Sequence, residues 1–353
     1  MRTPRIDIDI RKITHNIQQL KKLYKTKGIE ITGVTKLVGG NPKIAAVLVA
    51  NGIEILADSR IENIKKMIKS GIKAQYLLLR TPSLSQVEEV VTYADISLNS
   101  ELKILKELSK YALIHQTIHK VILMVELGDL REGIMPVDID NTVKEVLELK
   151  GIDFIGIGSN LACYGGVNPD VNKMNELSSI AIHLENKFKI RLTIVSGGNS
   201  ANYNWFKSSK NTGRINNLRI GESMFLGREA LCRKVIPNLF TDAFTLVVEI
   251  IETKIKPSKP YGKIYQNANG KIRKIKDKGV MNRGILAIGR QDVAISGIIP
   301  KQNISILGAS SDHIMIDNTK SNLNVADTVE FSLNYKALLR VLNSSYITKN
   351  IIY

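Results

Sequence analysis

From Glu30 to Gly227 the chain alternates short apolar runs with amphipathic segments. The segments between the runs, such as 60–70 and 100–111, place apolar residues at helical spacing with charged residues on the other face, which is typical of surface helices. The apolar runs have the length of buried strands. They predict eight strands, at Ile31–Lys36, Ile53–Ala57, Gln75–Leu79, Asp95–Leu98, Lys120–Glu126, Asp153–Gly158, Leu192–Ser196 and Leu218–Ile220.

Strand and helix alternating in this way favour a parallel sheet of the α/β class. Eight units favour closure of that sheet into a TIM-type (β/α)8 barrel. The alternative is an open, doubly wound sheet. Such sheets that bind dinucleotides carry a Gly-x-Gly-x-x-Gly turn after an early strand, and this chain has no such turn there.

The pattern changes after residue 230, where short β-rich runs are separated by Pro, Gly and Asn. The runs are Phe240–Thr253, Gly284–Ile288, Val293–Ile299, Ile304–Leu307, His313–Ile316 and Thr328–Leu333. They predict a C-terminal all-β domain. Residues 5–10 (RIDIDI) alternate polar and apolar positions, and we expect them to pair with this domain. The expected domains are therefore a barrel at residues 10–230 and a β domain at 231–353 that includes a strand at residues 4–9.

The composition of the 353 residues, 44% hydrophobic and 24% charged, is that of a globular protein. No apolar run approaches the roughly 20 residues that cross a bilayer, and the N-terminus lacks the apolar core of a signal peptide. Cys163 and Cys232 lack the spacing of a metal site or a disulfide framework. We therefore expect a cytoplasmic protein with no metal site and no membrane partner.

The formal net charge of +17 raises the question of a nucleic-acid partner. The lysines are spread through the chain, however, rather than gathered in one stripe. The densest stretch, 271–278 (KIRKIKDK), has no aromatic residue that could stack on bases. We expect no nucleic-acid partner.

Active sites of such barrels form at the carboxyl ends of the strands, and Lys36 stands at the end of the first one. A lysine in a partly buried mouth loses hydration and becomes nucleophilic, as Schiff-base chemistry with a carbonyl cofactor requires. The alternative is an ordinary strand-end lysine whose amine reaches water. On Lys36 alone, the ordinary strand-end lysine is favoured.

Two Gly- and Ser-containing segments follow the seventh and eighth predicted strands, namely 196–200 (SGGNS) and 219–228 (RIGESMFLGR). Glycines let backbone N–H groups converge on an anion. Phosphate sites in these barrels are often formed by the loops after strands seven and eight. Either segment alone could be a plain turn, but both at this position favour a phosphate.

Two other polar segments carry candidate chemistry. Residues 126–133 (ELGDLREG) follow the fifth strand, and the planar fork of Arg131 could orient a carboxylate or a phenol. Residues 310–313 (SSDH) contain the types of a hydrolase triad, but a triad needs converging geometry and the chain has no Gly-x-Ser-x-Gly elbow. Asp312 or His313 could still transfer protons.

Taken in order, these pieces resemble the alanine racemase fold type of pyridoxal-phosphate (PLP) enzymes. The stretches VTKLVGGNP, ELGDLREGI, GIGSNLACYGG, SGGNSANYN, AIGRQD and GASSDH are similar to the ornithine racemase branch of that family. The resemblance extends over almost the whole chain. It implies a PLP-dependent amino-acid racemase that works by two-base proton transfer at Cα.

The resemblance also implies roles for individual residues. Lys36 would hold the cofactor and act as one base, and Arg219 would face the pyridine nitrogen. The other implied cofactor contacts are Asn160, Asn199, Ser200, Gly221 and Glu222. Arg131 matches the arginine that helps to orient the second base.

The chain departs from the family at three positions. Arg290 stands where alanine racemases carry the tyrosine that is their second base, and an arginine is a poor base near neutrality. We therefore expect the second base to be Asp312 or His313, with Cys163 and Tyr164 as further alternatives. Gly40 replaces a tyrosine that follows the lysine, and Asn160 replaces a histidine.

The resemblance implies a homodimer with shared active sites and a basic substrate such as ornithine. Glu126, Asp129 and Arg290 are the expected substrate contacts. A cationic side chain needs an acidic partner in the mouth, which Glu126, Asp129 or Glu132 could supply, with Asp312 as a further possibility. Two alternatives stay open at this point. One is a PLP-dependent D-amino-acid lyase or decarboxylase on the same scaffold, and the other is a non-catalytic PLP-binding protein.

Overall fold

A computed structural model describes residues 2–266, 270, 272 and 275–353. The chain divides into two compact units, Lys12–Thr241 and Met1–Arg11 with Asp242–Tyr353. Each unit is described here by itself. Within the basic stretch 271–278, the residues Lys271, Arg273 and Lys274 lie outside the described part of the chain.

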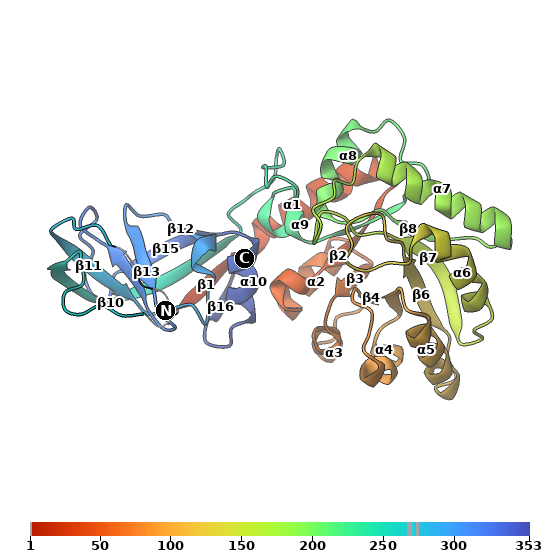
Figure 1. Ribbon diagram of the computed structural model, residues 1–353, viewed down its shortest axis with the longest axis horizontal. Helices are drawn as coiled ribbons and strands as arrows, with labels where there is room; N and C mark the ends of the chain where they lie inside the picture. Colours follow the sequence, from red (N-terminus) through yellow and green to blue (C-terminus); the bar gives the residue numbers. More distant parts are fainter. Residues whose placement is uncertain (1, 267–269, 271, 273–274) are drawn as a thin grey trace. The chain divides into compact units, whose positions relative to one another are not determined.

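Eight parallel strands of the first unit close into a barrel (Figure 1). They are β2 (Glu30–Val34), β3 (Ile55–Asp58), β4 (Gln75–Leu78), β5 (Ile96–Asn99), β6 (His119–Met124), β7 (Ile152–Gly158), β8 (Ile194–Ser196) and β9 (Asn217–Ile220). Neighbouring strands pair in parallel, and β9 pairs back to β2 with Arg219 opposite Thr32. The predicted (β/α)8 barrel is confirmed.

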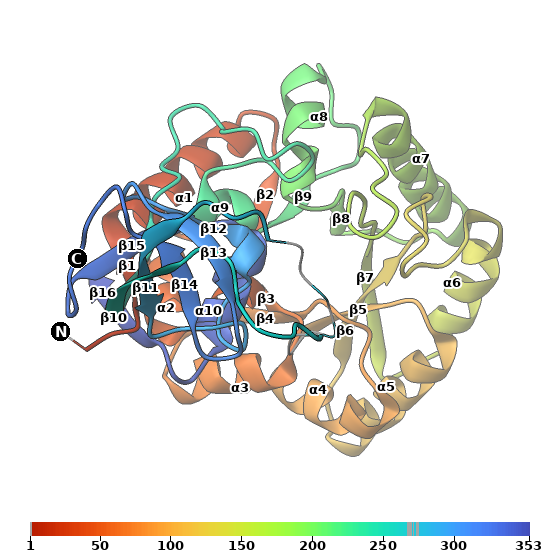
Figure 2. The same cartoon turned by 60° about the vertical axis from the view of Figure 1, so that its left-hand side comes forward.

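Helices alternate with these strands and lie on the outside of the barrel (Figure 2). They are α1 (Ile10–Lys25), α2 (Pro42–Ala50), α3 (Ile61–Lys69), α4 (Val87–Tyr93), α5 (Leu102–Ile114), α6 (Ile139–Leu147), α7 (Val171–Phe188), α8 (Tyr203–Ser208) and α9 (Glu222–Leu226). Short 3-10 turns precede several of them, at Lys36–Val38, Leu84–Gln86, Pro136–Asp138 and Ser200–Asn202. No helix in the described ranges combines the length and apolar character of a membrane span.

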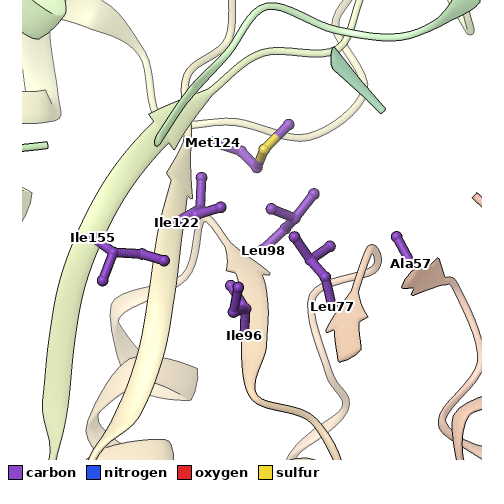
Figure 3. Close-up of a cluster of buried hydrophobic side chains, with 7 residues drawn as sticks. All are labelled: Ala57, Leu77, Ile96, Leu98, Ile122, Met124 and Ile155. Atoms are coloured by element: carbon purple, nitrogen blue, oxygen red, sulfur yellow. The ribbon is translucent and has the colours of Figure 1, made fainter. Parts of the chain in front are cut away.

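Apolar side chains at alternate strand positions fill the barrel interior, as the two-residue period of a strand requires. Figure 3 shows one such cluster, with side chains that converge from neighbouring strands. Its members are all buried: Ala57, Leu77, Ile96, Leu98, Ile122, Met124 and Ile155. This core holds the strands in register, so the carboxyl ends of all eight strands meet at one rim.

The second unit is an eight-stranded, mainly antiparallel sheet, which confirms the predicted C-terminal β domain. Its strands are β1 (Arg5–Asp9), β10 (Phe244–Pro257), β11 (Val280–Leu286), β12 (Ile298–Pro300), β13 (Ser305–Ala309), β14 (Ile314–Asp317), β15 (Thr328–Leu333) and β16 (Thr348–Ile352). β1 pairs antiparallel with β10 and parallel with β16. A 3-10 turn (Ile295–Gly297) precedes β12, and α10 (Tyr335–Asn343) connects β15 with β16.

Several local expectations differ from the structure, among them the run Phe240–Thr253, whose strand β10 begins and ends four residues later. The strand expected to end at Lys36 ends at Val34, so Lys36 begins a 3-10 turn. The run Val293–Ile299 forms mostly a turn, and only its last two residues belong to β12. The sequence pattern predicted neither α10, whose asparagine cap Asn334 accepts from the Ala337 N–H, nor β16.

A buried histidine, His119, lies in the barrel wall at the start of β6. His119 is 2% exposed, and its Nε2 lies 2.8 Å from Ser97 Oγ on β5. Burial disfavours the charged imidazolium and lowers the pKa of His119 to about 4. The folded barrel therefore holds this histidine neutral through the mildly acidic range.

This burial predicts a pH dependence of stability. An unfolded histidine takes up a proton near pH 6.5, and the folded one resists until about pH 4. The contribution of His119 to the free energy of unfolding is therefore complete above pH 6.5. It is lost as the pH falls to about 4, and the total loss is about 3 kcal/mol. Denaturant unfolding of wild type and His119→Gln between pH 4 and 8 measures it. The variant should show a shallower decline, whereas His115→Gln, at an exposed position, should keep the decline; equal slopes in wild type and His119→Gln would contradict the assignment.

Candidate active site

Lys36 lies at the carboxyl end of β2, half-buried, at the first position of the turn Lys36–Val38. The turn ends in Gly39 and Gly40, which both have positive φ (58° and 57°), where glycine is favoured. A Cβ at Gly40 would lie 2.7 Å from Cβ of Asn63 on α3. The positive φ and the close contact with α3 together favour glycine at this position.

A buried carboxylate fixes the backbone just before Lys36. The Thr35 hydroxyl donates to Asp58 Oδ2 at 2.8 Å, and the Thr35 N–H donates to the Ala57 carbonyl at 2.8 Å. The other oxygen of Asp58 accepts from the Arg60 N–H and from Asn63, both at 3.0 Å. Burial raises the pKa of Asp58, although these hydrogen bonds oppose the shift. Lys36 is therefore held at a defined point of the rim.

The loops after β7, β8 and β9 are tied together by side-chain hydrogen bonds. Asn199 Nδ2 donates to Asn160 Oδ1 at 3.1 Å and to the Leu161 carbonyl at 3.0 Å. The Ser200 hydroxyl accepts from the Ser223 N–H at 3.1 Å. The segment predicted to bind phosphate thus joins three neighbouring strand ends in one structure.

Two buried side-chain atoms at this rim have no hydrogen-bond partner among the described residues. They are Asn160 Nδ2, after β7, and Asn99 Oδ1, at the end of β5. A buried polar atom without a partner costs free energy, and a ligand is one of the ways in which native proteins satisfy it. The orientation of Asn160 follows from its contact with Asn199, which leaves its amide N–H groups as the available donors. A bound group with an acceptor here would fit these residues.

Arg219 on β9 is a buried cation, 4% exposed, that makes no ion pair within the described ranges. Its Nη1 donates to Ser196 Oγ at 2.5 Å and its Nη2 to the Ser159 carbonyl at 2.6 Å. Burial lowers the pKa of Arg219 to about 10, so the guanidinium stays charged at neutral pH. Its two hydrogen bonds go to neutral acceptors, and the nearby charges of Glu132 and Arg131 shift its pKa in opposite directions.

The Arg219 contacts continue into the barrel as a chain of buried groups. Ser196 Oγ donates to Asn217 Oδ1 at 2.7 Å, and Asn217 Nδ2 donates to Thr32 Oγ1 at 3.0 Å. Ser196 and Thr32 are each 1% exposed. These bonds fix the side chains below Arg219, and so they fix the direction in which its guanidinium points.

The loop after β6 carries Arg131, whose Nε and Nη2 donate to Glu132 and whose Nη1 lies 2.8 Å from Cys163 Sγ. Burial lowers the pKa of Arg131, but Glu132 raises it by more. Arg131 therefore connects this loop with the loop after β7.

The carboxylates of Glu126 and Asp129 hold these loops through backbone contacts. Glu126 accepts from the N–H groups of Gly128, Leu130 and Arg131 at 2.5, 3.0 and 3.2 Å. Asp129 accepts from the N–H groups of three residues of the next loop, Cys163, Tyr164 and Val167. Burial raises the pKa of Asp129, but these bonds lower it by more.

At the end of β9, Gly221 packs closely against β2, where a Cβ would lie 3.1 Å from Val34 Cβ. The carboxylate of Glu222 lies 2.6 Å from Arg233 Nη1. Burial raises the pKa of Glu222, and the charges of Arg233 and Lys36 oppose that shift. The structure thus brings the β9 end and the Lys36 segment together.

Three other expected site residues lie in the β domain, which the predicted range 231–353 already includes. Arg290, Asp312 and His313 are all exposed there. Arg290 Nε donates to the Ala309 carbonyl at 3.0 Å, and Asp312 accepts from Gln291 at 2.7 Å and from Ser311 at 2.7 Å. These contacts shape the loops around β13 and β14.

Sequence reasoning gave no role to Asp58, Ser196, Asn217 or Thr32. Asp58 and Ser196 were visible as polar residues at strand ends. Thr32 and Asn217 carried a weaker signal, polar residues inside otherwise apolar strands. Their pairing across β2 and β9 depends on barrel closure, which no single segment reveals.

Residues 8–229 match the model of the alanine racemase N-terminal domain. The chain belongs to the alanine racemase family. This family consists of PLP enzymes, and the chain is an amino-acid racemase of it.

Relatives of this racemase match it along almost its whole length. The ornithine racemase of Acetoanaerobium sticklandii is 42% identical over 353 residues, 99% of each chain. The lysine racemase of Thermotoga maritima is 36% identical over 348 residues, 98% of each chain. The alanine racemase structure of Clostridium difficile 630 has the same fold, with a TM-score of 0.77 at 17% identity, over 100% of this chain and 96% of that one.

The chain of buried hydrogen bonds predicts that Ser196→Ala destabilises the racemase. The change leaves Arg219 Nη1 and Asn217 Oδ1 without their partner, at a cost of about 1–3 kcal/mol. Denaturant unfolding of the purified protein measures the cost. Ser208→Ala removes an exposed hydroxyl that bonds only within α8, and it should cost no more than about 0.5 kcal/mol. Equal stability of the two variants would show that the chain does not support Arg219.

Proposed function

We propose that this racemase interconverts the L and D forms of a basic amino acid, ornithine or lysine, with PLP bound at the barrel rim. The observation that carries the proposal is a buried Arg219, which makes no ion pair within the described ranges, on the same barrel rim as a fixed Lys36. The names of the two full-length relatives support the substrate class. The orphan donor of Asn160 supports a bound cofactor.

The rim residues have distinct roles in this proposal. When bound, PLP withdraws electrons from the substrate and so acidifies its Cα–H. Lys36 holds the cofactor and moves a proton on one face of Cα. Arg219 would donate a hydrogen bond to the pyridine nitrogen without giving up its own proton, since its pKa of about 10 keeps it charged. Asn160, Asn199, Ser200, Gly221 and Glu222 would complete the cofactor site, with the Ser200 hydroxyl and the backbone N–H groups of Gly221 and Glu222 at the phosphate.

The substrate side of the proposal uses the carboxylates of the loop after β6. Glu126 and Asp129 already accept backbone N–H groups, but a carboxylate has about four acceptor positions and can also face a cation. They, and Arg290, stay our predicted substrate contacts. We also propose a homodimer with shared active sites, which would let Asp312 and His313 of a second copy contribute.

The second base must act on the other face of Cα. Of the candidates, Cys163 is supported by a contact at the rim itself, because Arg131 Nη1 lies 2.8 Å from its sulfur. A guanidinium stabilises negative charge on an acceptor that it contacts. The Asp129 bonds also fix the backbone of Cys163. We therefore rank Cys163 ahead of Asp312, His313 and Tyr164.

Incubation in D₂O with PLP and each enantiomer of ornithine or lysine tests the proposed reaction. Both enantiomers should gain deuterium at Cα and approach the racemic mixture. Lys36→Ala should lose more than about 100-fold in rate and lose the visible absorption of lysine-bound cofactor, whereas Lys43→Ala, at an exposed site, should keep both. Absence of Cα exchange with any amino acid would refute racemisation, and cleavage or CO₂ release would favour a lyase or decarboxylase.

The same exchange measurement identifies the second base. When one base of a two-base enzyme is removed, the remaining base still exchanges the Cα proton of the enantiomer whose proton faces it. Cys163→Ala should therefore exchange one enantiomer only and lose racemisation, while Cys232→Ala, at the other exposed cysteine, should behave as wild type. One-sided exchange in His313→Ala or Asp312→Asn instead, with a normal Cys163→Ala, would move the role to the β domain.

A further inference from the structure

The β domain contains a hollow of about 660 Å³, well within the range of small-molecule sites. The segment after β11, the strand β13 and the helix α10 contribute its lining. Aliphatic side chains such as Val293, Ile295 and Ile306 form part of this lining, together with the Ser296 hydroxyl. The hollow lies entirely within one unit of the chain.

Three cations line this hollow, and no carboxylate does. They are Arg290, Lys336 and Arg340. All three are exposed, and none forms an ion pair with another residue in the part of the chain that the structure describes. Lys336 and Arg340 stand four residues apart on α10, where like charges repel and destabilise a helix. A bound anion would remove this repulsion.

Arg290 is already oriented at the hollow. Its Nε donates to the Ala309 carbonyl at 3.0 Å, and its backbone N–H donates to the Ser310 carbonyl at 2.9 Å. The guanidinium is thus fixed through one nitrogen, and its two terminal nitrogens remain for a ligand. Such a planar fork matches the paired oxygens of a carboxylate or phosphate. An oriented guanidinium loses little freedom when an anion binds.

We propose that this hollow binds a small organic anion that carries at least two carboxylate or phosphate groups. The cations bind the charged groups, and the aliphatic wall contacts the carbon skeleton. Ornithine and lysine do not fit this description, since their side chains are cationic. Arg290 is also a predicted substrate contact, whereas Lys336 and Arg340 belong to this hollow alone. The site therefore assigns the β domain an anionic ligand in addition to the racemase substrate.

Isothermal titration of the full-length protein at fixed ionic strength tests the site, with citrate as the carboxylate probe and pyrophosphate as the phosphate probe. Wild type should bind at least one probe, and the one that binds identifies the anionic group. Lys336→Gln/Arg340→Gln should bind it at least about 10-fold more weakly. Thermal unfolding of each variant confirms that it is folded.

The matched control is Lys254→Gln/Arg283→Gln. It removes the same two charges from paired positions on β10 and β11, outside the hollow, and should bind like wild type. An equal loss in both double variants would show that the net charge of +17 attracts the anion without a site. If neither probe binds to wild type, the proposal is overturned. A second copy of the chain that fills the hollow would give this result.

Discussion

The site depends on a buried guanidinium whose hydrogen bonds, within the described residues, go to neutral groups and to no carboxylate. Removing a charge from water carries a large free-energy cost that only well-placed acceptors offset. Here a serine hydroxyl and a backbone carbonyl accept from Arg219, and the serine is in turn held by Asn217 and Thr32. These groups lie on β2, β8 and β9 or directly after β7, so barrel closure and charge burial depend on each other.

The alternation of apolar runs and amphipathic segments was enough to predict the barrel, because strand and helix periods differ clearly. The observed strands of the barrel lie within about two residues of their predicted bounds. The β domain was harder to predict. A short strand such as β16 or a turn such as 295–297 is stabilised by pairing with distant segments, and its own residues carry little signal.

The site was partly predictable in the same sense. Strand-end position placed Lys36 and the segments that begin at Ser196 and Arg219 among the candidates, because the fold brings strand ends together. The roles of Lys36 and Arg219 came from the family resemblance. Strand-end position could not reveal that Asp129 binds the backbone of the next loop, since those bonds join residues up to 38 positions apart. Nor could it show that Arg131 contacts Cys163. Contacts between loops depend on the lengths and paths of both, which sequence spacing does not fix.

The Asp129 carboxylate binds its neighbouring loop almost wholly through main-chain N–H groups. Main-chain groups are common to nearly all residue types, so the path of segment 163–167 does not rely on the side chains that it displays. Tyr164, which is exposed, can be exchanged without loss of the anchoring bonds. In evolution or in the laboratory, the side chains of this segment can therefore change while the barrel and the path of the loop stay as they are.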